Sequence, residues 1–339
     1  MTPTYQVSAN GADLTAKLKT RLISLTISDE TGINSDSVEI EIDDRDGAVA
    51  IPPFGADLVV GIGYTETGIV AKGRFRVDEI ETSGPDRRML IRARSADTNA
   101  ATSMPQIKAK TTKTWLWPDG HAMTIGDILQ KIAADNQLMF SCRDATIATA
   151  IPASDQQTAE SDINYLGREA RNVGGQLKIA NGVLIVFRQG TGKTAGTGQS
   201  MPTIDVIPSD CMRWRCLITR RSSHRKVSAV SVDANGQENK IIMTSQDASE
   251  LDSTTEIPER FATDEDRDNA ATALVNALDV GSESVSLSMV GNPAIGVEVR
   301  LNLVGFKPGV DRVWIVARVQ HRIDEQGFTT EVETVKEFE

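Results

Sequence analysis

Two neighbouring segments of the chain alternate between apolar and polar residues: residues 22–28 read LISLTIS and residues 37–44 read SVEIEIDD. The first places Ile23, Leu25 and Ile27 on one side. The second places Val38, Ile40 and Ile42 opposite Glu39 and Glu41. Successive side chains of a strand point to opposite faces, so this period of two predicts two β-strands with one buried face each.

Segments of the same kind follow, separated by Asp-Gly, Pro-Pro and Gly-Pro turn signals. They are ADLVVGIGY (56–64), GRFRVDEIET (73–82) and RRMLIRARSAD (87–97). Short strands at this spacing predict an antiparallel barrel or sandwich. The pattern returns in ESVSLSMVG (283–291) and continues towards the C-terminus, so we expect a second β domain of similar character. The polar stretch 244–262 is expected to be irregular.

The region between these β segments has a helical period instead. Thr124 and Asp127 fit a capping box ahead of an apolar stripe, which predicts a helix over 124–136. A second helix is expected over 159–173, ending at Gly174-Gly175. QLKIANGVLIVF (176–187) then predicts a hairpin that turns at Asn181-Gly182.

These patterns predict an α+β, mainly β chain with two antiparallel β domains, each a barrel or a sandwich, and a small helix-helix-hairpin insert between them. The expected parts are an N-terminal β domain (1–104), the α+β insert (105–187), a Gly/Thr-rich linker (188–200) and a second β domain (201–339). The last part includes a helix near 264–279, which Thr263 and Asp266 would cap.

The stretch FRQGTGKTAGTG (187–198) contains the end of the phosphate-binding pattern G-x-x-x-x-G-K-[ST]. Phe187 stands where that pattern requires its first glycine. Gly196, Gly198 and Pro202 preclude the helix whose N-terminus would receive a phosphate. We therefore interpret the stretch as a flexible connection at a domain boundary.

Composition narrows the classes of function. The 339 residues carry a net charge of −11, which argues against sequence-independent nucleic-acid binding because that binding neutralises phosphates. A local basic stretch lacks the aromatic ladder of a nucleic-acid site and is interpreted as a solvated strand-and-turn face: Arg213, Arg215, Arg220, Arg221, His224, Arg225 and Lys226. No window approaches the ~18 apolar residues of a membrane helix, so no membrane insertion is expected.

No constellation of residues points to catalysis or to a cofactor. Cys211 and Cys216 are spaced C-x4-C, but no second Cys or His pair completes a zinc site. Cys142 is the third cysteine, and the histidines His121, His224 and His321 lie far apart. We therefore expect no catalytic, cofactor-binding or metal-binding residues. Trp115 and Trp117 could form an exposed binding platform, but packing of the insert against a β domain is the favoured interpretation.

Several stretches together resemble the late control D family, the tail hub proteins of contractile-tailed bacteriophages and phage-tail-like bacteriocins. The opening strands (20–64 and 72–97) carry the resemblance first. TIGDILQKIAADNQL (124–138) and the Gln-x-x-x-Glu-Ser-Asp pattern at 156–162 follow in the family's order. ESVSLSMVG, VRLNLVGF and GFTTEVET agree near the end. The resemblance is weakest over 201–262, where longer members carry a lysine-rich insertion that this chain lacks.

This resemblance implies a structural hub and no enzyme. It implies a homotrimer in which each chain contributes two barrels related to the tail tube subunit, so that three chains adapt a hexameric tube to a trimeric central spike. The expected partners are the tail tube protein, the central spike protein, the tape-measure protein and other baseplate proteins. The expected location is a virion or bacteriocin particle, in its tail baseplate, after assembly in the bacterial cytoplasm.

Two alternatives remain open from the sequence. One is a hub-type enzyme, either a nucleotide hydrolase acting through Lys193 or a cell-wall hydrolase. The other is the hub of a related bacterial contractile injection system. If the chain is a tail hub, the exposed alternation of Glu39 and Glu41 suggests that part of its negative charge faces the channel of the ring.

Overall fold

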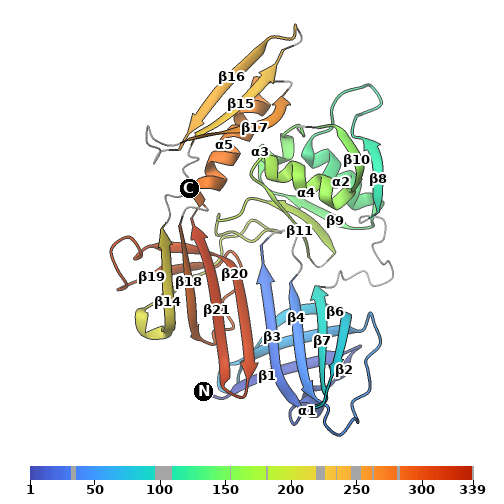
Figure 1. Cartoon of the computed structure of the whole chain (residues 1–339), viewed down its shortest axis with the longest axis vertical. Coiled ribbons are helices and arrows are strands. Elements are labelled where there is room, and N and C mark those ends of the chain that lie inside the picture. The colour runs from blue at the N-terminus through green and yellow to red at the C-terminus, as the bar shows by residue number, and fades with distance from the viewer. Residues whose placement is uncertain are drawn as a thin grey trace. The chain divides into compact units, whose positions relative to one another are not determined.

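A computed structural model describes residues 1–31, 36–95, 109–152, 154–180, 182–218, 226–233, 235–245, 253–261, 263–280 and 283–337. The chain is mainly β, as the sequence predicts. Its contacts divide it into two units, which Figure 1 shows coloured along the chain. Unit 1 comprises residues 1–100, 202–215 and 285–334, and unit 2 comprises residues 101–201, 216–284 and 335–339.

The N-terminal half of unit 1 is an antiparallel sheet wrapped around one apolar core. Its strands run in the order β3-β4-β7-β6-β5-β1-β2. The strands predicted over residues 22–97 are all present, and their inward residues, such as Val38, Ile40 and Phe75, are buried together. The elements are β1 (Pro3–Ala9), β2 (Ala12–Asp13), α1 (Thr15–Leu18), β3 (Leu22–Glu30), β4 (Ser37–Asp43), β5 (Asp57–Tyr64), β6 (Gly68–Ser83) and β7 (Arg88–Ser95).

One detail of the first quoted segment differs from its simple alternation. The β3–β4 register shifts between Leu22 and Ser24, where the ladder is irregular. Leu22 therefore packs against the core beside Leu25, and Ile23 does not join that core. A bulge inserts one residue into a strand, so the alternation predicted for Ile23 is wrong at this point and correct for Leu25 and Ile27.

The C-terminal half of unit 1 has strands in the order β13-β19-β20-β21-β18-β14. Its side chains Leu287, Trp314 and Val332 are fully buried. The elements are β13 (Thr203–Val206), the 3₁₀ turn η1 (Pro208–Asp210), β14 (Cys211–Ile218), β18 (Glu283–Val290), β19 (Arg300–Leu303), β20 (Val313–Asp324) and β21 (Gly327–Lys336).

Strand β20 joins the two halves into one 13-stranded sheet. Its first residues pair with β19, and the stretch from Arg318 to Asp324 pairs antiparallel with β3, from Glu30 to Ser24. The two β regions predicted from the sequence therefore share a continuous hydrogen-bonded sheet. The existence of two separate barrel domains stays a prediction.

The two halves repeat one strand order. The first half contains β3-β4-β7-β6-β5-β1, and the second contains β14-β18-β21-β20-β19-β13, with each strand in the same place by chain order. In both, a long strand forms a hairpin with the strand that follows it: β6 with β7, and β20 with β21. The outermost pair differs, because β1–β5 is antiparallel and β13–β19 is parallel.

The insert in unit 2 has its own core and confirms the predicted helices and hairpin. Thr124 caps α2 (Ile125–Asp135) with the expected reciprocal box to Asp127. The second helix, α4 (Asp162–Asn172), begins three residues later than predicted because β10 (Gln156–Ser161) precedes it. Asn181 lies outside the described residues. The other elements are β8 (Lys110–Thr114), β9 (Met139–Cys142), α3 (Ala145–Thr149), β11 (Gln176–Ala180) and β12 (Val183–Phe187).

The remainder of unit 2 is a three-stranded sheet in the order β16-β15-β17 with one helix. Its elements are β15 (Lys226–Val232), β16 (Glu238–Thr244), β17 (Thr254–Phe261) and α5 (Asp264–Val280). Thr263 accepts a hydrogen bond from the Asp266 amide at 3.1 Å, which confirms the predicted cap. The irregular structure expected over 244–262 is wrong for β17, whose side chain Phe261 is buried in a core with Val227 and Ala271. Contacts therefore divide residues 201–339 between the two units instead of keeping them in one.

Candidate interaction surfaces

The loop that carries GTGKT is an ordered turn. The Thr194 amide donates to the Gln199 carbonyl at 2.8 Å, and the Gly198 amide donates to the Thr194 carbonyl at 2.8 Å. The Ser141 hydroxyl of β9 donates to the Gly196 carbonyl at 2.9 Å. These bonds satisfy the backbone locally, so the connection expected from the glycine content contains a hydrogen-bonded turn. Lys193 is exposed, and the next described element is strand β13 in place of the helix that follows a phosphate-binding loop.

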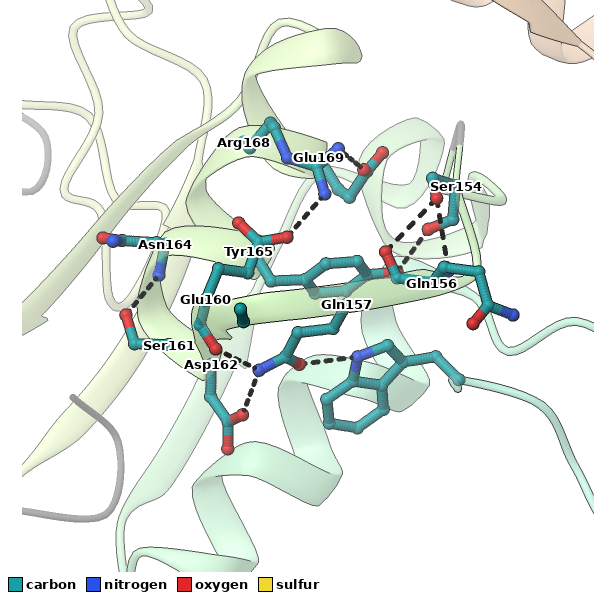
Figure 2. A network of polar contacts seen from close by, with 12 residues as sticks. Ser154, Gln156, Gln157, Glu160, Ser161, Asp162, Asn164, Tyr165, Arg168 and Glu169 are labelled. Carbon is teal, nitrogen blue, oxygen red and sulfur yellow. Dashed lines mark hydrogen bonds and ion pairs between the residues drawn. The ribbon is translucent and has the colours of Figure 1, made fainter. Parts of the chain in front are cut away.

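A buried glutamine organises the insert. Figure 2 shows Gln157 between a tryptophan and Asp162, with no exposed surface of its own. Its carbonyl accepts from the Trp115 indole nitrogen at 2.9 Å. Its amide nitrogen donates to the Asp162 carboxylate at 2.8 Å and to the Glu160 carbonyl at 2.9 Å. Buried polar groups are costly without partners, so this residue ties β8 and β10 to the start of α4.

Charged residues complete the same network. Lys113 donates to the Asp162 carboxylate at 2.8 Å, and Arg168 donates to Glu160 at 2.8 Å and also pairs with Glu169. Ser161 caps α4 by accepting from the Asn164 amide at 3.3 Å. Glu160, Ser161 and Asp162 of the Gln-x-x-x-Glu-Ser-Asp pattern therefore stabilise the insert together with Gln157, which occupies an unspecified position of that pattern.

The two tryptophans separate in the structure. Trp115 is 2% exposed and stacks on Tyr165 at a ring distance of 5.7 Å, whereas Trp117 is 45% exposed. The favoured interpretation was packing of the insert against a β domain. Trp115 packs instead in the insert's own core.

A second buried polar group lies inside unit 1. The Lys72 ammonium of β6 donates to the carbonyls of Pro293 at 2.7 Å and Ile295 at 3.2 Å. It also lies 3.0 Å from the Nε2 atom of His321, whose Nδ1 atom lies 3.0 Å from the Thr330 hydroxyl. Burial lowers the pKa of Lys72 to about 8. Burial, and secondarily the Lys72 charge, lowers the pKa of His321 to about 3. This cluster ties the N-terminal half of unit 1 to its C-terminal half.

The face of unit 1 opposite the core carries rows of charge on successive strands. We call this face the polar wall; it follows the order β14-β18-β21-β20-β3-β4-β7-β6, which runs across Figure 1. Arginines and glutamates alternate along it and form ion pairs: Arg318–Glu30 at 2.8 Å, Arg88–Glu41 at 3.1 Å, Arg92–Glu39 at 3.2 Å and Arg92–Glu81 at 3.5 Å. The wall is hollowed over β14, β18, β21 and β20 by a groove of about 430 Å³.

These ion pairs bear on the expected charge of a channel. Glu39 and Glu41 are the residues that suggested an acidic surface, and each is paired with an arginine of β7. Paired charges of opposite sign largely cancel beyond about one Debye length. The two glutamates therefore do not by themselves make an acidic surface.

The polar wall ends at two strand edges. Strand β14 is the last strand of the sheet and pairs only with β18 within the described chain. Strand β6 pairs with β5 as far as Arg76, and Val77 still bonds to Ala56. From Asp78 to Ser83, the described residues show a ladder only to β7. An unpaired edge exposes a row of backbone donors and acceptors, which is a template for another strand.

Sequence reasoning named none of these surfaces as sites. The basic stretch that it interpreted as a solvated face includes Arg213 and Arg215 of β14, while residues 219–225 lie outside the described residues. The free edge of β6 has a signal in its length, because β6 extends seven residues beyond Arg76, the last of its residues that pairs with β5. A strand has a free edge when no distant segment pairs with that edge, and a local sequence pattern does not show which edges remain free.

Among the described residues, no helix combines the length and apolar character needed to cross a bilayer. No protein-family model matches the chain. Two curated proteins match it over nearly its whole length, and both are named probable baseplate hub proteins. The one from Escherichia phage P2 is 29% identical and the match covers 98% of this chain and 93% of that protein. The one from Escherichia phage 186 is 27% identical, with 98% and 92% covered.

Both relatives carry the name of a phage baseplate hub protein, which confirms the resemblance to tail hub proteins seen in the sequence. Among solved structures, a tail protein from Neisseria meningitidis MC58 superposes with a TM-score of 0.67 at 12% identity, covering 99% of this chain and 97% of that one. The 43 kDa tail protein of prophage MuSo2 from Shewanella oneidensis gives a TM-score of 0.66 at 13% identity, with 99% and 98% covered. At such identities the likeness establishes the fold.

Proposed function

We propose that this chain is the structural hub of a contractile phage tail or phage-tail-like bacteriocin, and that three copies form a ring. The ring adapts a hexameric tail tube to a trimeric central spike. The observation that carries this proposal is the strand order repeated in the two halves of unit 1. Three chains with two similar halves each supply six nearly equivalent positions, which is what a junction between three-fold and six-fold symmetry requires.

The similarity to baseplate hub proteins over almost the whole chain supports this assignment. Under it, the chain contacts the tail tube protein on one side of the ring and the spike protein on the other. The tape-measure protein and other baseplate proteins are further partners. The protein is then a component of the tail baseplate, added during assembly in the bacterial cytoplasm.

We also propose that the role is mechanical and not enzymatic. The polar networks around Gln157 and Lys72 join strands and loops of their own unit, and the Lys193 turn is closed by its own backbone bonds. These groups are accounted for by the stability of the fold. A hydrolase would need a nucleophile or a pair of carboxylates free to act on a substrate.

The test is the mass of the purified protein by light scattering and native mass spectrometry, followed by co-purification with the tube and spike proteins of the same particle. We expect a trimer that binds both. A strict monomer at high micromolar concentration that binds neither would overturn the proposal. Hydrolysis of a nucleotide or of peptidoglycan that is lost in Lys193→Ala or another single variant would favour the enzyme instead.

A further inference from the structure

We infer that β14 of one copy pairs with the free edge of β6 in the next copy, so that the polar wall continues from chain to chain. This inference deepens the proposed ring and rests on it. It names the two strand edges that close the ring and the side chains that select them.

The repeated strand order makes the argument. In the order of each half, β14 takes the place of β3 and β6 takes the place of β20. Within the chain, β3 and β20 pair antiparallel over seven residues, from Glu30–Arg318 to Ser24–Asp324. The equivalent partners of that pair are β14 and β6. They lie at opposite ends of the polar wall (Figure 1), so a single chain cannot join them.

Both edges have the form that strand addition needs. The segment Asp78–Ser83 of β6 extends past its last contact with β5, just as the second part of β20 extends past β19 to reach β3. Strand β14 is bonded along one side only in the described chain. Proteins that stay monomeric usually cover or shorten such strand edges, so two long exposed edges are unusual in a monomer. We call the line along which the two edges pair the seam between copies; pairing leaves neither edge exposed there.

Charge selects the partner. Arg213 and Arg215 of β14 are exposed, line the groove of the polar wall and make no ion pair with the described residues. At the other end of the wall, the side chains of Glu79 and Glu81 are 54% and 56% exposed and share Arg92. Two basic residues on one edge thus meet two acidic residues on the other, which favours this pairing and repels a copy presented in the wrong order.

The seam within the chain has the opposite polarity. There the basic side chain, Arg318, lies on the long strand β20 and the acidic one, Glu30, lies on β3. At the seam between copies the long strand β6 is acidic and β14 is basic. A copy whose β14 approached β20 would place arginine against arginine. The two seams therefore cannot exchange partners.

The apolar side of β14 fits the same arrangement. Met212 lies on the side opposite Arg213 and is 60% exposed. On β6, Ile80 is half-buried and packs against the core of the N-terminal half. Pairing of the two strands covers both side chains, and burial of apolar surface adds to the strand hydrogen bonds.

The experiment reverses charge at one edge, at the other and at both. The variants are Glu79→Arg with Glu81→Arg, Arg213→Glu with Arg215→Glu, and all four changes together. The matched control is Glu238→Arg with Glu256→Arg, which reverses two glutamates in the three-stranded sheet of unit 2 whose side chains are 58% and 59% exposed. Trimer dissociation is followed by native mass spectrometry and light scattering over a dilution series, and circular dichroism verifies that each variant folds.

We expect each double reversal to raise the concentration at which the trimer dissociates at least about tenfold, because like charges then face each other across the seam. The fourfold variant should recover most of the loss, and the control should stay close to the native protein. As a second measurement, a Glu79→Cys or Glu81→Cys change is combined with Arg213→Cys or Arg215→Cys, in a background with Cys211→Ser and Cys216→Ser. One of these pairs should form a disulfide between chains.

The outcomes separate the inference from the function on which it rests. A native trimer whose dissociation is unchanged by both double reversals, and in which no cysteine pair links two chains, overturns the seam and leaves the ring. A native protein that is monomeric overturns the ring itself. A control variant that weakens the trimer as much as the edge variants would attribute the effect to general charge and would also overturn the seam.

Discussion

The free energy of unfolding of unit 1 depends on pH through a buried histidine, His321. His321 is 2% exposed, and its pKa falls from 6.5 to about 3 because burial disfavours the charged ring. Between those two values the unfolded chain binds a proton that the folded chain does not. The contribution of His321 is therefore complete above pH 6.5 and is lost as the pH falls towards 3.

The size of the effect follows from linkage. For those two pKa values, the free energy of opening decreases by about 2 kcal/mol between pH 7 and pH 5, which corresponds to a roughly thirtyfold loss of protection. The assay is hydrogen–deuterium exchange with mass spectrometry on peptides that cover β20 and β21. Rates are corrected for the intrinsic dependence of exchange on pH.

His321→Gln keeps a polar side chain but removes the titrating group, so protection of the same peptides should depend less on pH by that factor. The matched control is His121→Gln, because the His121 side chain is 81% exposed and should leave the native dependence unchanged. In Lys72→Met the loss should still begin near pH 6.5 but should level off at a higher pH and be smaller in total, since removing the Lys72 charge raises the pKa of folded His321. Equal loss of protection in the native protein and in His321→Gln would refute the reasoning.

Three further predictions concern single sites. Gln157→Ala should destabilise the insert by about 3 kcal/mol because it leaves the buried Trp115 indole without an acceptor and removes one of the donors to Asp162. Gln156→Ala on the exposed side should cost less than about 1 kcal/mol. Thermal unfolding followed by near-ultraviolet circular dichroism compares the two variants. Gly291→Ala should lower the free energy of unfolding by about 1–3 kcal/mol or prevent folding, since a Cβ atom there would lie 2.1 Å from the Phe328 ring. A Cβ atom in the control Gly196→Ala would meet nothing within 4 Å. Urea unfolding midpoints compare the two variants, and equal midpoints would contradict the prediction. Lys193→Ala should leave assembly and nucleotide binding unchanged, and an ATP affinity by calorimetry that depends on Lys193 would contradict the structural interpretation of the turn.

Local patterns predicted most of the elements, because each depends on neighbours in the sequence. The alternation around Leu25 and Ile40 follows from the geometry of a strand. The Thr124–Asp127 cap follows from the free amides at a helix start, and it is present as predicted. One prediction was wrong where a distant contact overrode a local signal: strand β17 forms in a polar stretch because β15 pairs with it.

The sequence by itself determined the mainly β class, the insert and the resemblance to tail hub proteins, since strand period, helix caps and motif order are written in adjacent residues. Only the tertiary structure decided that β3 pairs with β20 and that β6 and β14 keep free edges. It also decided that Lys72 meets His321, 249 residues further along the chain. Pairings of this kind are selected by the packing of whole sheets, and their energy is shared among segments that carry no mark of one another in the sequence.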